Sequence, residues 1–430
     1  MNSQYVQEYG PSFSLDIKNK SNEDIRKIID RLNIKYKKKL HLSNPPFQNP
    51  EANKFRIGDI TGQIRISNLE LVIVPKYLQI DDSQKWLKAL MHMLHISKTI
   101  SYSPHSTVKG SKNRLYFIDL IAADFIDSLA PAIKSGLPLG YIKQKQESSF
   151  LRGRIDIIQQ TKNIFSKPHV VACITETLTE NIPLSIVLKW ACRFLSYKVT
   201  NVFLRYRLSE FLENFSEVSD ILPPSGVIDR LGILGTQIQY QRPFEIAQAL
   251  INQSGQNFDP KSSQTPGILF KSSKVFEDFI SSCLTRIARR NERWTHSKQK
   301  WMRLAIGPAN PVGVKPDDVL YVDGNVALVL DSKYKNNLVD DPKGKANRED
   351  IYQLICSCRA ASSNYGVLIY PSPEPLLNCK LSEYEIVKEQ KPKKFFTLGV
   401  PPMELAEQDG ESRILNHLEK NIQKIINASI

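Results

Sequence analysis

The sequence lacks several features that mark common classes of protein. Cysteines are few for a chain of 430 residues, and no two of them form a C-x-x-C pair. This scatter argues against a zinc or iron–sulfur site and is typical of free thiols in a reducing cytoplasm. The six cysteines are Cys173, Cys192, Cys283, Cys356, Cys358 and Cys379.

Long hydrophobic runs are also absent. The most apolar long stretch, Ile182–Leu195, is interrupted by Lys189 and Arg193, so no bilayer-spanning helix is expected. The first residues show no basic start followed by an apolar run, which a secretory signal would need. We therefore expect a cytoplasmic protein with no membrane partner.

A phosphate-binding loop of the form G-x-x-x-x-G-K-[ST] is missing as well. Gly307 and Gly313 precede Lys315, but their spacing is wrong and Val314 separates glycine from lysine. Because such a loop cradles nucleotide phosphates with its backbone amides, we expect this chain to bind no nucleotide. Work driven by a nucleotide would then need a second chain.

Negative charge is scarcer than positive charge. The chain has 44 acidic residues against 58 lysines and arginines, which gives a formal net charge of +14. Such an excess favours an acidic partner: nucleic acid, an anionic membrane face or an acidic protein. The alternative is a basic surface that only maintains solubility. A hydrophobic content of 41% is ordinary for folded domains and argues against general disorder.

The order of sequence patterns predicts three domains of mixed α/β class (α+β overall). Residues 1–165 favour a β-rich domain with strands at 64–66 and 69–74, and residues 166–262 favour a mainly helical region. The polar segment 252–267 is typical of a linker. Residues 263–430 alternate helices and strands, which indicates a mixed central sheet flanked by helices. The elements expected in addition are helices at 84–97, 112–135, 271–290 (N-capped by Ser272 or Ser273), 347–362 and 411–427, and strands at 365–370 and 395–400.

Two acidic residues flank a predicted hairpin at 318–335. Apolar runs on either side of Asp323-Gly324-Asn325 are a strong hairpin signal. A three-residue loop would place Asp317 opposite Asp331, with Cβ atoms roughly 4.5–5.5 Å apart. Like charges in that position destabilise a hairpin, so the pair suits a shared divalent cation better than a scaffold.

The same hairpin predicts a catalytic lysine. Side chains two residues apart share a face of a strand, so Lys333 should point to the same side as Asp331. The acids would hold Mg²⁺, a metal-acidified water would attack a phosphodiester, and Lys333 would orient that water or stabilise the phosphate. The alternative is a solvated turn with a surface ion pair, and a two-residue turn or a bulge would remove the opposition.

Two further polar residues fit this site. Glu277 on the helix at 271–290 could contact the metal or its water, although a first-turn acid is equally explained by the helix dipole. Gln353 on the helix at 347–362 could hydrogen-bond the metal water or the DNA backbone.

A basic segment with interleaved aromatics precedes the acids. Basic side chains neutralise phosphates, and aromatic rings such as Trp294 and Trp301 can stack on bases. A solvated charged face is the alternative, and it is favoured for a second run, Lys35–Lys39. The predicted DNA-binding residues are Arg286, Arg289, Arg290, Arg293, Lys298, Lys300, Arg303 and Lys335.

These motifs together resemble the PD-(D/E)XK nuclease superfamily and, within it, the McrC family of nuclease subunits from McrBC modification-dependent restriction systems. The resemblance covers most of the chain. The motifs that carry it are Gly62-Gln63-Ile64-Arg65, Ile73-Val74-Pro75-Lys76, Gly136 with Tyr141, Leu151-Arg152-Gly153-Arg154-Ile155, Phe276-Glu277, Pro316-Asp317, Asp331-Ser332-Lys333-Tyr334-Lys335, Arg348 to Leu354 and Gly366 to Pro371. Two places depart from the family pattern: Ser357, where a tyrosine is frequent, and the polar Lys271-Ser272-Ser273.

The resemblance implies an activity, a cofactor and a partner. It implies a DNA endonuclease that hydrolyses double-stranded DNA carrying methylcytosine-type modifications. Catalysis would use Asp317, Asp331, Lys333, Glu277 and Gln353. Mg²⁺, or Mn²⁺, would be held by Asp317, Asp331, the backbone carbonyl of Ser332 and Glu277. The partner would be an McrB-like AAA+ GTPase that docks on the N-terminal half and is stimulated by it.

Two other functions are compatible with these patterns. The chain could be a non-catalytic activator of the GTPase, although its intact acids and lysine argue against that. It could also be a stand-alone repair nuclease. Relatives of that kind with an iron–sulfur cluster need four suitably spaced cysteines, which this sequence does not have.

Overall fold

A computed structural model describes residues 2–15, 17, 21–51, 54–66, 69–78, 85–97, 117–199, 201–254, 268–306, 311–335, 347–386 and 392–427. The chain divides into two compact units, residues 1–104 with 262–430 (unit 1) and residues 105–261 (unit 2). This division differs from the predicted boundary at 165, which falls inside unit 2. Most of the predicted linker 252–267 lies outside the described residues, but the second boundary between the units falls within it.

The N-terminal part of unit 1 is built on a four-stranded sheet in the order β1-β5-β4-β9. The sheet contains β1 (Asn2–Gln7), β4 (Thr61–Ile66), β5 (Leu69–Val74) and β9 (Ile268–Phe270). The sequence predicted β4 and β5. It did not predict β1, which is parallel to β5. It also did not predict β9, which follows unit 2 in the sequence and pairs with β4. The N-terminal sheet therefore contains a strand from the first residues of the segment 263–430, which was predicted to form the separate C-terminal domain.

Smaller elements complete this part of unit 1. They are α1 (Asn22–Lys39), α2 (Lys85–Ile96) and the pair β2 (Phe47–Glu51) and β3 (Lys54–Ile57). Helix α1 buries Ile25, Ile29 and Tyr36 in the core and ends in three lysines. The run Lys35–Lys39 thus forms the largely exposed end of this helix, as predicted.

The C-terminal part of unit 1 is a six-stranded mixed sheet in the order β10-β13-β14-β15-β17-β16. Its strands are β10 (Trp294–Lys298), β13 (Asp318–Val322), β14 (Asn325–Ser332), β15 (Tyr365–Pro371), β16 (Ser382–Glu385) and β17 (Lys394–Val400). Strands β14, β15 and β17 run parallel, and the other pairs are antiparallel. This matches the mixed sheet expected from the alternating pattern.

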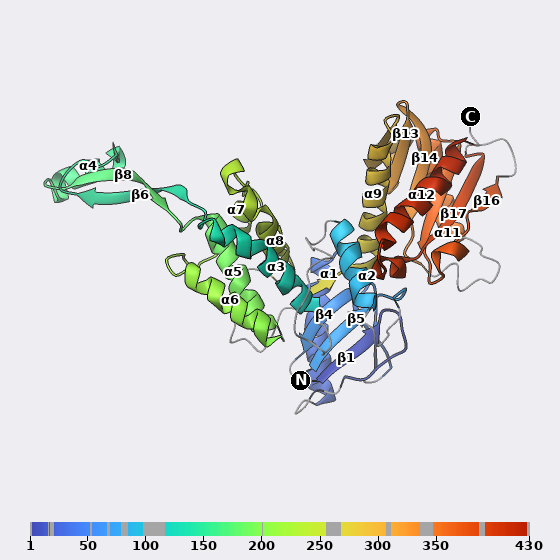
Figure 1. The fold of residues 1–430 in the computed structure, drawn as a ribbon, viewed down its shortest axis with the longest axis horizontal. Helices are drawn as coiled ribbons and strands as arrows, with labels where there is room; N and C mark the ends of the chain where they lie inside the picture. The colour runs from blue at the N-terminus through green and yellow to red at the C-terminus, as the bar shows by residue number, and fades with distance from the viewer. Residues whose placement is uncertain are drawn as a thin grey trace. The chain divides into compact units, whose positions relative to one another are not determined.

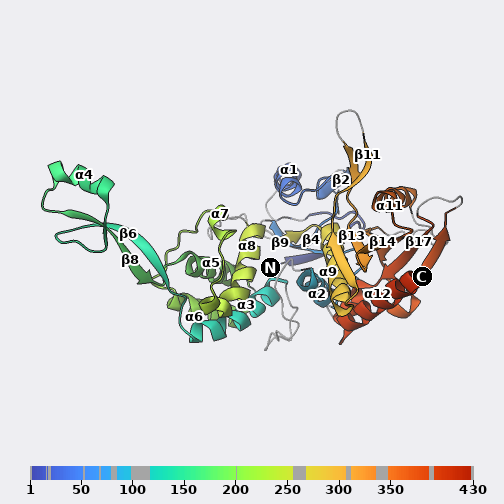
Figure 2. The same cartoon turned by 90° about the horizontal axis from the view of Figure 1, so that it is seen from above.

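Helices cover both faces of the mixed sheet (Figure 2). Helix α11 (Arg348–Ala361) packs on β14 and β15, while α9 (Ser272–Arg290) and α12 (Gly410–Asn427) lie on the opposite face. A separate hairpin of β11 (Met302–Ile306) and β12 (Pro311–Val314) packs against α11. Two short 3-10 helices, η2 (Leu376–Asn378) and η3 (Pro402–Ala406), occupy the connections around β16 and β17.

The hairpin of β13 and β14 reaches the predicted register by a different route. Val322 pairs with Asn325, so the loop has two residues, and the predicted three-residue loop is wrong. Asp323 and Gly324 both have positive φ, as such a loop requires. A bulge at Ala327 then adds one residue to β14 and restores the pairing of Asp318 with Leu330. The tight turn and the bulge cancel, and the hairpin ends with Asp317 and Asp331 beside each other.

The start of helix α9 also differs from the prediction. The N-cap is Lys271, which makes no side-chain cap hydrogen bond, rather than Ser272 or Ser273. The free amide of Ser273 instead donates to Asp59 Oδ1 at 2.7 Å, and the Ser273 hydroxyl bonds the other oxygen of that carboxylate. The helix is therefore capped by an acid from the N-terminal part of unit 1, which satisfies a helix-end amide from outside the helix.

Unit 2 combines a helical core with a long β-arm. The core holds α3 (Phe117–Lys134), α5 (Pro183–Lys198), α6 (Val202–Asn214), α7 (Ser225–Ile228), η1 (Gly235–Tyr240) and α8 (Gln241–Ser254). The arm consists of β6 (Gly140–Ser148) and β8 (Val171–Thr179), which pair along their whole length, with β7 (Arg154–Ile155) and α4 (Ile157–Ser166) at its end (Figure 1). Because β6 pairs with β8, a boundary at 165 would divide this hairpin.

All six cysteines are free, and five of them are buried. Among the described helices, none is both long enough and apolar enough to cross a bilayer.

Candidate active site

The two predicted acids meet at the end of the β13–β14 hairpin. Asp331 is the penultimate residue of β14 and is 2% exposed. Asp317 directly precedes β13, and its Oδ2 accepts a hydrogen bond from the backbone amide of Ser332 at 2.9 Å. Asp331 Oδ1 is buried and has no hydrogen-bond partner. An orphaned buried carboxylate oxygen beside a second carboxylate is costly unless a cation joins them.

The raised pKa of Asp317 reflects this cost. Burial, first, and the neighbouring charges of Asp331 and Glu277 raise the pKa of Asp317 from 3.8 to about 8. The Ser332 amide opposes the rise because it stabilises the charged form. Without a cation, the site disfavours the state in which Asp317 and Asp331 are both ionised. A bound divalent cation would strongly favour that state.

Lys333 lies on the same side of the strand as Asp331. Its Nζ is 2.6 Å from Asp331 Oδ2 and donates to Gln353 Oε1 at 2.8 Å. Gln353 projects from α11, which packs on β14, so a helix and a strand hold the ammonium from two sides. The structure therefore brings together Asp317, Asp331, Lys333 and Gln353, as their predicted roles require.

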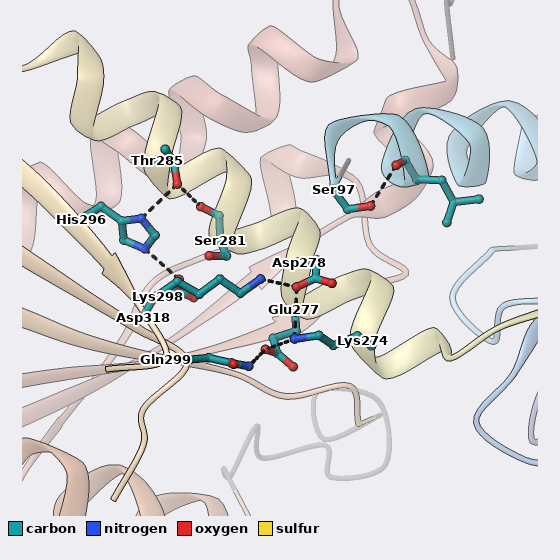
Figure 3. A network of polar contacts seen from close by, with 11 residues as sticks. Ser97, Lys274, Glu277, Asp278, Ser281, Thr285, His296, Lys298, Gln299 and Asp318 are labelled. Carbon is teal, nitrogen blue, oxygen red and sulfur yellow. Dashed lines mark hydrogen bonds and ion pairs between the residues drawn. The ribbon is translucent and has the colours of Figure 1, made fainter. Parts of the chain in front are cut away.

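Glu277 is hydrogen-bonded to Gln299 (Figure 3), which in turn contacts the backbone of Asp317. Glu277 Oε1 accepts from Lys274 Nζ at 2.7 Å and from Gln299 Nε2 at 2.6 Å. The backbone amide of Gln299 in turn donates to the carbonyl of Asp317 at 2.8 Å. Gln299 has φ 48°, an uncommon backbone conformation for a residue other than glycine. Sequence patterns gave no sign of Gln299, because its partners lie 22 and 18 positions away along the chain.

A second network supports Asp318, the neighbour of Asp317. Asp318 Oδ1 lies 2.7 Å from His296 Nε2, and His296 Nδ1 lies 3.0 Å from Thr285 Oγ1 on α9 (Figure 3). Thr285 donates its hydroxyl to the carbonyl of Ser281 at 2.9 Å. Asp318 and the His296 side chain are almost fully buried. These hydrogen bonds connect β13 to β10 and α9. In the sequence, the Pro-Asp-Asp motif was the only signal that could have indicated this network.

The donor set fits a hard divalent cation. Mg²⁺ in proteins is bound by one or two carboxylates and keeps several waters or substrate oxygens. The carboxylates of Asp317 and Asp331 meet that description, and the Ser332 carbonyl as a third ligand stays a prediction. Within the part of the chain that the structure describes, no group of three or more acidic, histidine or cysteine side chains is arranged to hold a metal ion. Glu277 as a direct ligand therefore stays a prediction.

Most of the predicted DNA-binding cations are paired with acids. The paired side chains are Arg286 with Glu411, Arg290 with Glu419, Arg293 with Asp323, Lys298 with Asp278 and Lys335 with Asp350. Lys300 donates to the Tyr321 hydroxyl at 3.1 Å. These partners reduce the charge that is free to meet a phosphate.

Two cations of the set remain open. Arg289 and Arg303 are exposed, and among the described residues neither has an ion-pair partner. Trp301 is 53% exposed and could stack on a base, whereas Trp294 is buried and could not. Contact of the basic segment with DNA stays a prediction, carried mainly by Arg289 and Arg303.

Comparison with known proteins identifies the family. The model of the McrBC family, described as a component of the McrBC 5-methylcytosine restriction system, matches residues 55–371. That span is well over half of the chain. The chain belongs to the McrBC family.

Solved structures with the same fold come from Thermococcus gammatolerans. One is a chain of the refined half-complex from the tetradecameric assembly of McrB AAA+ hexamers with bound McrC, at 18% identity, with a TM-score of 0.70, over 98% of this chain and 100% of that one. Another belongs to a cryo-EM structure of the McrBC complex, at 19% identity, with a TM-score of 0.51, over 66% of this chain and 88% of that one. No curated protein matches.

The McrBC family match begins in β3 and ends with β15, so it contains both acids, Lys333 and Gln353. It also contains the whole of unit 2 and the Pro75-Lys76 motif after β5. The candidate active site therefore lies within the region that the family model matches.

Proposed function

We propose that this chain is the metal-dependent DNA endonuclease subunit of an McrBC-type restriction system, with the PD-(D/E)XK type of nuclease fold. The observation that carries the proposal is the meeting of Asp317, Asp331 and Lys333 at the end of one hairpin, with a buried oxygen of Asp331 left unpartnered. As scaffolding this arrangement is unfavourable. As a catalytic site for phosphodiester hydrolysis it has each group that the chemistry needs.

The residues would divide the work as follows. Asp317, Asp331 and the Ser332 carbonyl would hold Mg²⁺ or Mn²⁺, which when bound acidifies a water and neutralises phosphate charge. Lys333 would orient the attacking water or donate to the phosphate oxygen on which charge develops. Gln353 would hold the Lys333 ammonium and lies exposed, where it could also reach the DNA backbone. Glu277 would orient the site through Gln299.

The proposed substrate is double-stranded DNA with methylcytosine-type modifications. The family description names a 5-methylcytosine restriction system, and the net charge of +14 suits a polyanion. The proposed partner is an McrB-like AAA+ GTPase, because the structures of the same fold contain McrB hexamers with bound McrC. Recognition of the modification and nucleotide hydrolysis would belong to that partner.

The arm of unit 2 is the surface that we propose for partner binding. Its end exposes Phe165 (90%), Ile157 (76%) and Ile158 (73%) on α4, and Phe150 (54%) and Leu151 (54%) beside it. Exposed apolar groups of this kind mark protein interfaces. Replacing Phe165 with Asp should abolish stimulation of the partner's GTPase and leave the melting temperature of the isolated chain unchanged. Full stimulation by this variant would show that the partner binds another surface.

A matched pair of variants tests the nuclease itself. Asp331→Asn removes a proposed metal ligand, and Asp323→Asn changes an exposed aspartate in the turn of the same hairpin. Assembled with partner and GTP, Asp323→Asn should cut modified DNA at the wild-type rate, and Asp331→Asn should not cut. Equal cutting by both variants would reject the nuclease assignment. GTPase stimulation without cutting by the wild type would leave the chain as an activator.

A further inference from the structure

Three tyrosine rings surround the ammonium of Lys76 next to the candidate active site. Lys76 Nζ lies 4.9 Å from the ring centroid of Tyr9, 4.9 Å from that of Tyr77 and 4.7 Å from that of Tyr334. It also donates a hydrogen bond to the backbone carbonyl of Tyr334 at 3.1 Å. Cation–π attraction and this hydrogen bond therefore act together on one residue of the nuclease segment.

The side chain of Tyr334 is held at its other end by Glu8. The Tyr334 hydroxyl donates to Glu8 Oε2 at 2.6 Å, and the backbone amide of Lys76 donates to the same oxygen at 3.2 Å. Glu8 is 1% exposed. The ring of Tyr77 meets that of Tyr334 edge to face at 4.9 Å. Tyr334 is thus gripped at its carbonyl, its ring and its hydroxyl by residues that follow β1 and β5.

Tyr334 directly follows Lys333 in the chain. Beyond β14, the Lys333 amide donates to the Ile369 carbonyl at 2.8 Å, and the Lys335 ammonium pairs with Asp350 on α11. The next described residue, Lys335, is followed by a segment outside the described residues. The direction in which Lys333 leaves the sheet therefore depends on what holds Tyr334.

We infer that Lys76 and Glu8 are positioning residues that fix Lys333 and Asp331 through Tyr334, which makes the N-terminal sheet part of the catalytic apparatus. This inference rests on the proposed nuclease function. It also gives a role to the Pro75-Lys76 motif, since Pro75 ends β5 and turns Lys76 toward the catalytic strand. A half-buried cation beside a buried acid is a poor way to gain stability, but the pair specifies one geometry well.

The test compares three variants with a control in the full chain assembled with partner and GTP. Lys76→Met removes the cation, Tyr334→Phe removes only the bond to Glu8, and Lys76→Arg keeps a cation able to donate. The control is Lys27→Met, an exposed lysine on α1. The measurements are kcat and KM for DNA cleavage, and hydrogen–deuterium exchange of residues 331–335.

We expect Lys76→Met and Tyr334→Phe to lower kcat at least about tenfold with KM unchanged, because a small misplacement of a catalytic group is costly. Exchange at residues 331–335 should rise in both. Lys76→Arg should retain most of the activity, and Lys27→Met should match the wild type. Melting temperatures report any general loss of folding.

Each outcome decides a separate point. Wild-type cutting by Lys76→Met and Tyr334→Phe overturns the inference whether or not exchange rises. Slower cutting with unchanged exchange at 331–335 also overturns it, since the contacts of Lys76 and Glu8 with Tyr334 would then not be what holds the strand. If the wild type itself does not cut, the nuclease proposal fails, and exchange alone then shows whether Lys76 and Glu8 hold the strand.

Discussion

Replacing Asp317 with Asn should make the metal-free protein more stable while it abolishes cleavage. Asp317 lies beside Asp331, and burial with that neighbouring charge raises its pKa to about 8. The amide of Asn carries no charge and can still accept the hydrogen bond from the Ser332 amide. The substitution therefore removes an electrostatic penalty and keeps the shape of the site.

The size of the effect follows from the pKa. A carboxyl whose pKa rises from 3.8 to about 8 on folding destabilises the charged state by up to about 6 kcal/mol, at about 1.4 kcal/mol per pH unit. Relaxation and residual hydration of the site reduce this upper bound, so we expect a gain of about 2 kcal/mol or more near pH 8. A gain of that size would raise the melting temperature by several degrees.

The pH dependence has a definite sign. The folded carboxyl binds its proton more tightly than the unfolded one, so its contribution is most favourable below pH 4 and declines as the pH rises toward 8. Unfolding of wild type and Asp317→Asn should be measured from pH 4.5 to 8.5 in EDTA. The variant should gain over the wild type as pH rises, because it lacks this titration.

Metal addition completes the test. Mg²⁺ should stabilise the wild type by binding only the folded site, and it should stabilise Asp317→Asn much less. The reasoning would be refuted if the variant were less stable than the wild type at pH 8 in EDTA. Equal stabilisation of both proteins by Mg²⁺ would show that the ion binds elsewhere.

Three further outcomes are expected. Replacing Arg289 and Arg303 together by Ala should lower the slope of log K against log salt for DNA binding by about two, that is, by about one per arginine. Arg293→Ala should lower it by less than about one, because that side chain already pairs with an acid; a decrease of about one would show that the ion pair opens on DNA. Asp318→Ala should cost about 2–4 kcal/mol of unfolding free energy because it leaves His296 buried without its partner, and Asp318→Asn should cost less in the same denaturation experiment. Gly62→Ala should cost at least about 2 kcal/mol in thermal unfolding, since Gly62 has φ 122° and a Cβ there would lie 2.1 Å from the Ile268 carbonyl oxygen; a wild-type melting temperature would contradict the close pairing of β4 with β9.

The β13–β14 hairpin shows what sequence patterns can and cannot predict. Its existence, its turn and the meeting of Asp317 with Asp331 follow from alternation and from the Asp-Gly-Asn signal. The loop length was predicted wrongly, and a bulge at Ala327 corrected the register. A pattern of period two reveals neither the shorter turn nor the bulge, because a one-residue change in the turn and a one-residue bulge have opposite effects on the pairing.

The basic segment shows a different limit. A run of cations is obvious in the sequence, but its free charge is not. Glu411 and Glu419 on α12 and Asp323 in the hairpin turn each neutralise an arginine from far along the chain. Sequence distance carries no information about such partners, so only the structure singles out Arg289 and Arg303.

Local chemistry by itself determined α9, α11, α12 and the strands β13, β14, β15 and β17, together with the paired acids, Lys333 and the family resemblance, because each depends on residues within a few turns or one hairpin. The tertiary structure alone decided that β9 joins the N-terminal sheet, that Asp59 caps α9 and that Lys76 and Glu8 hold Tyr334. These contacts join residues more than 200 positions apart, and their energy comes from burial and pairing that exist only after the chain has folded.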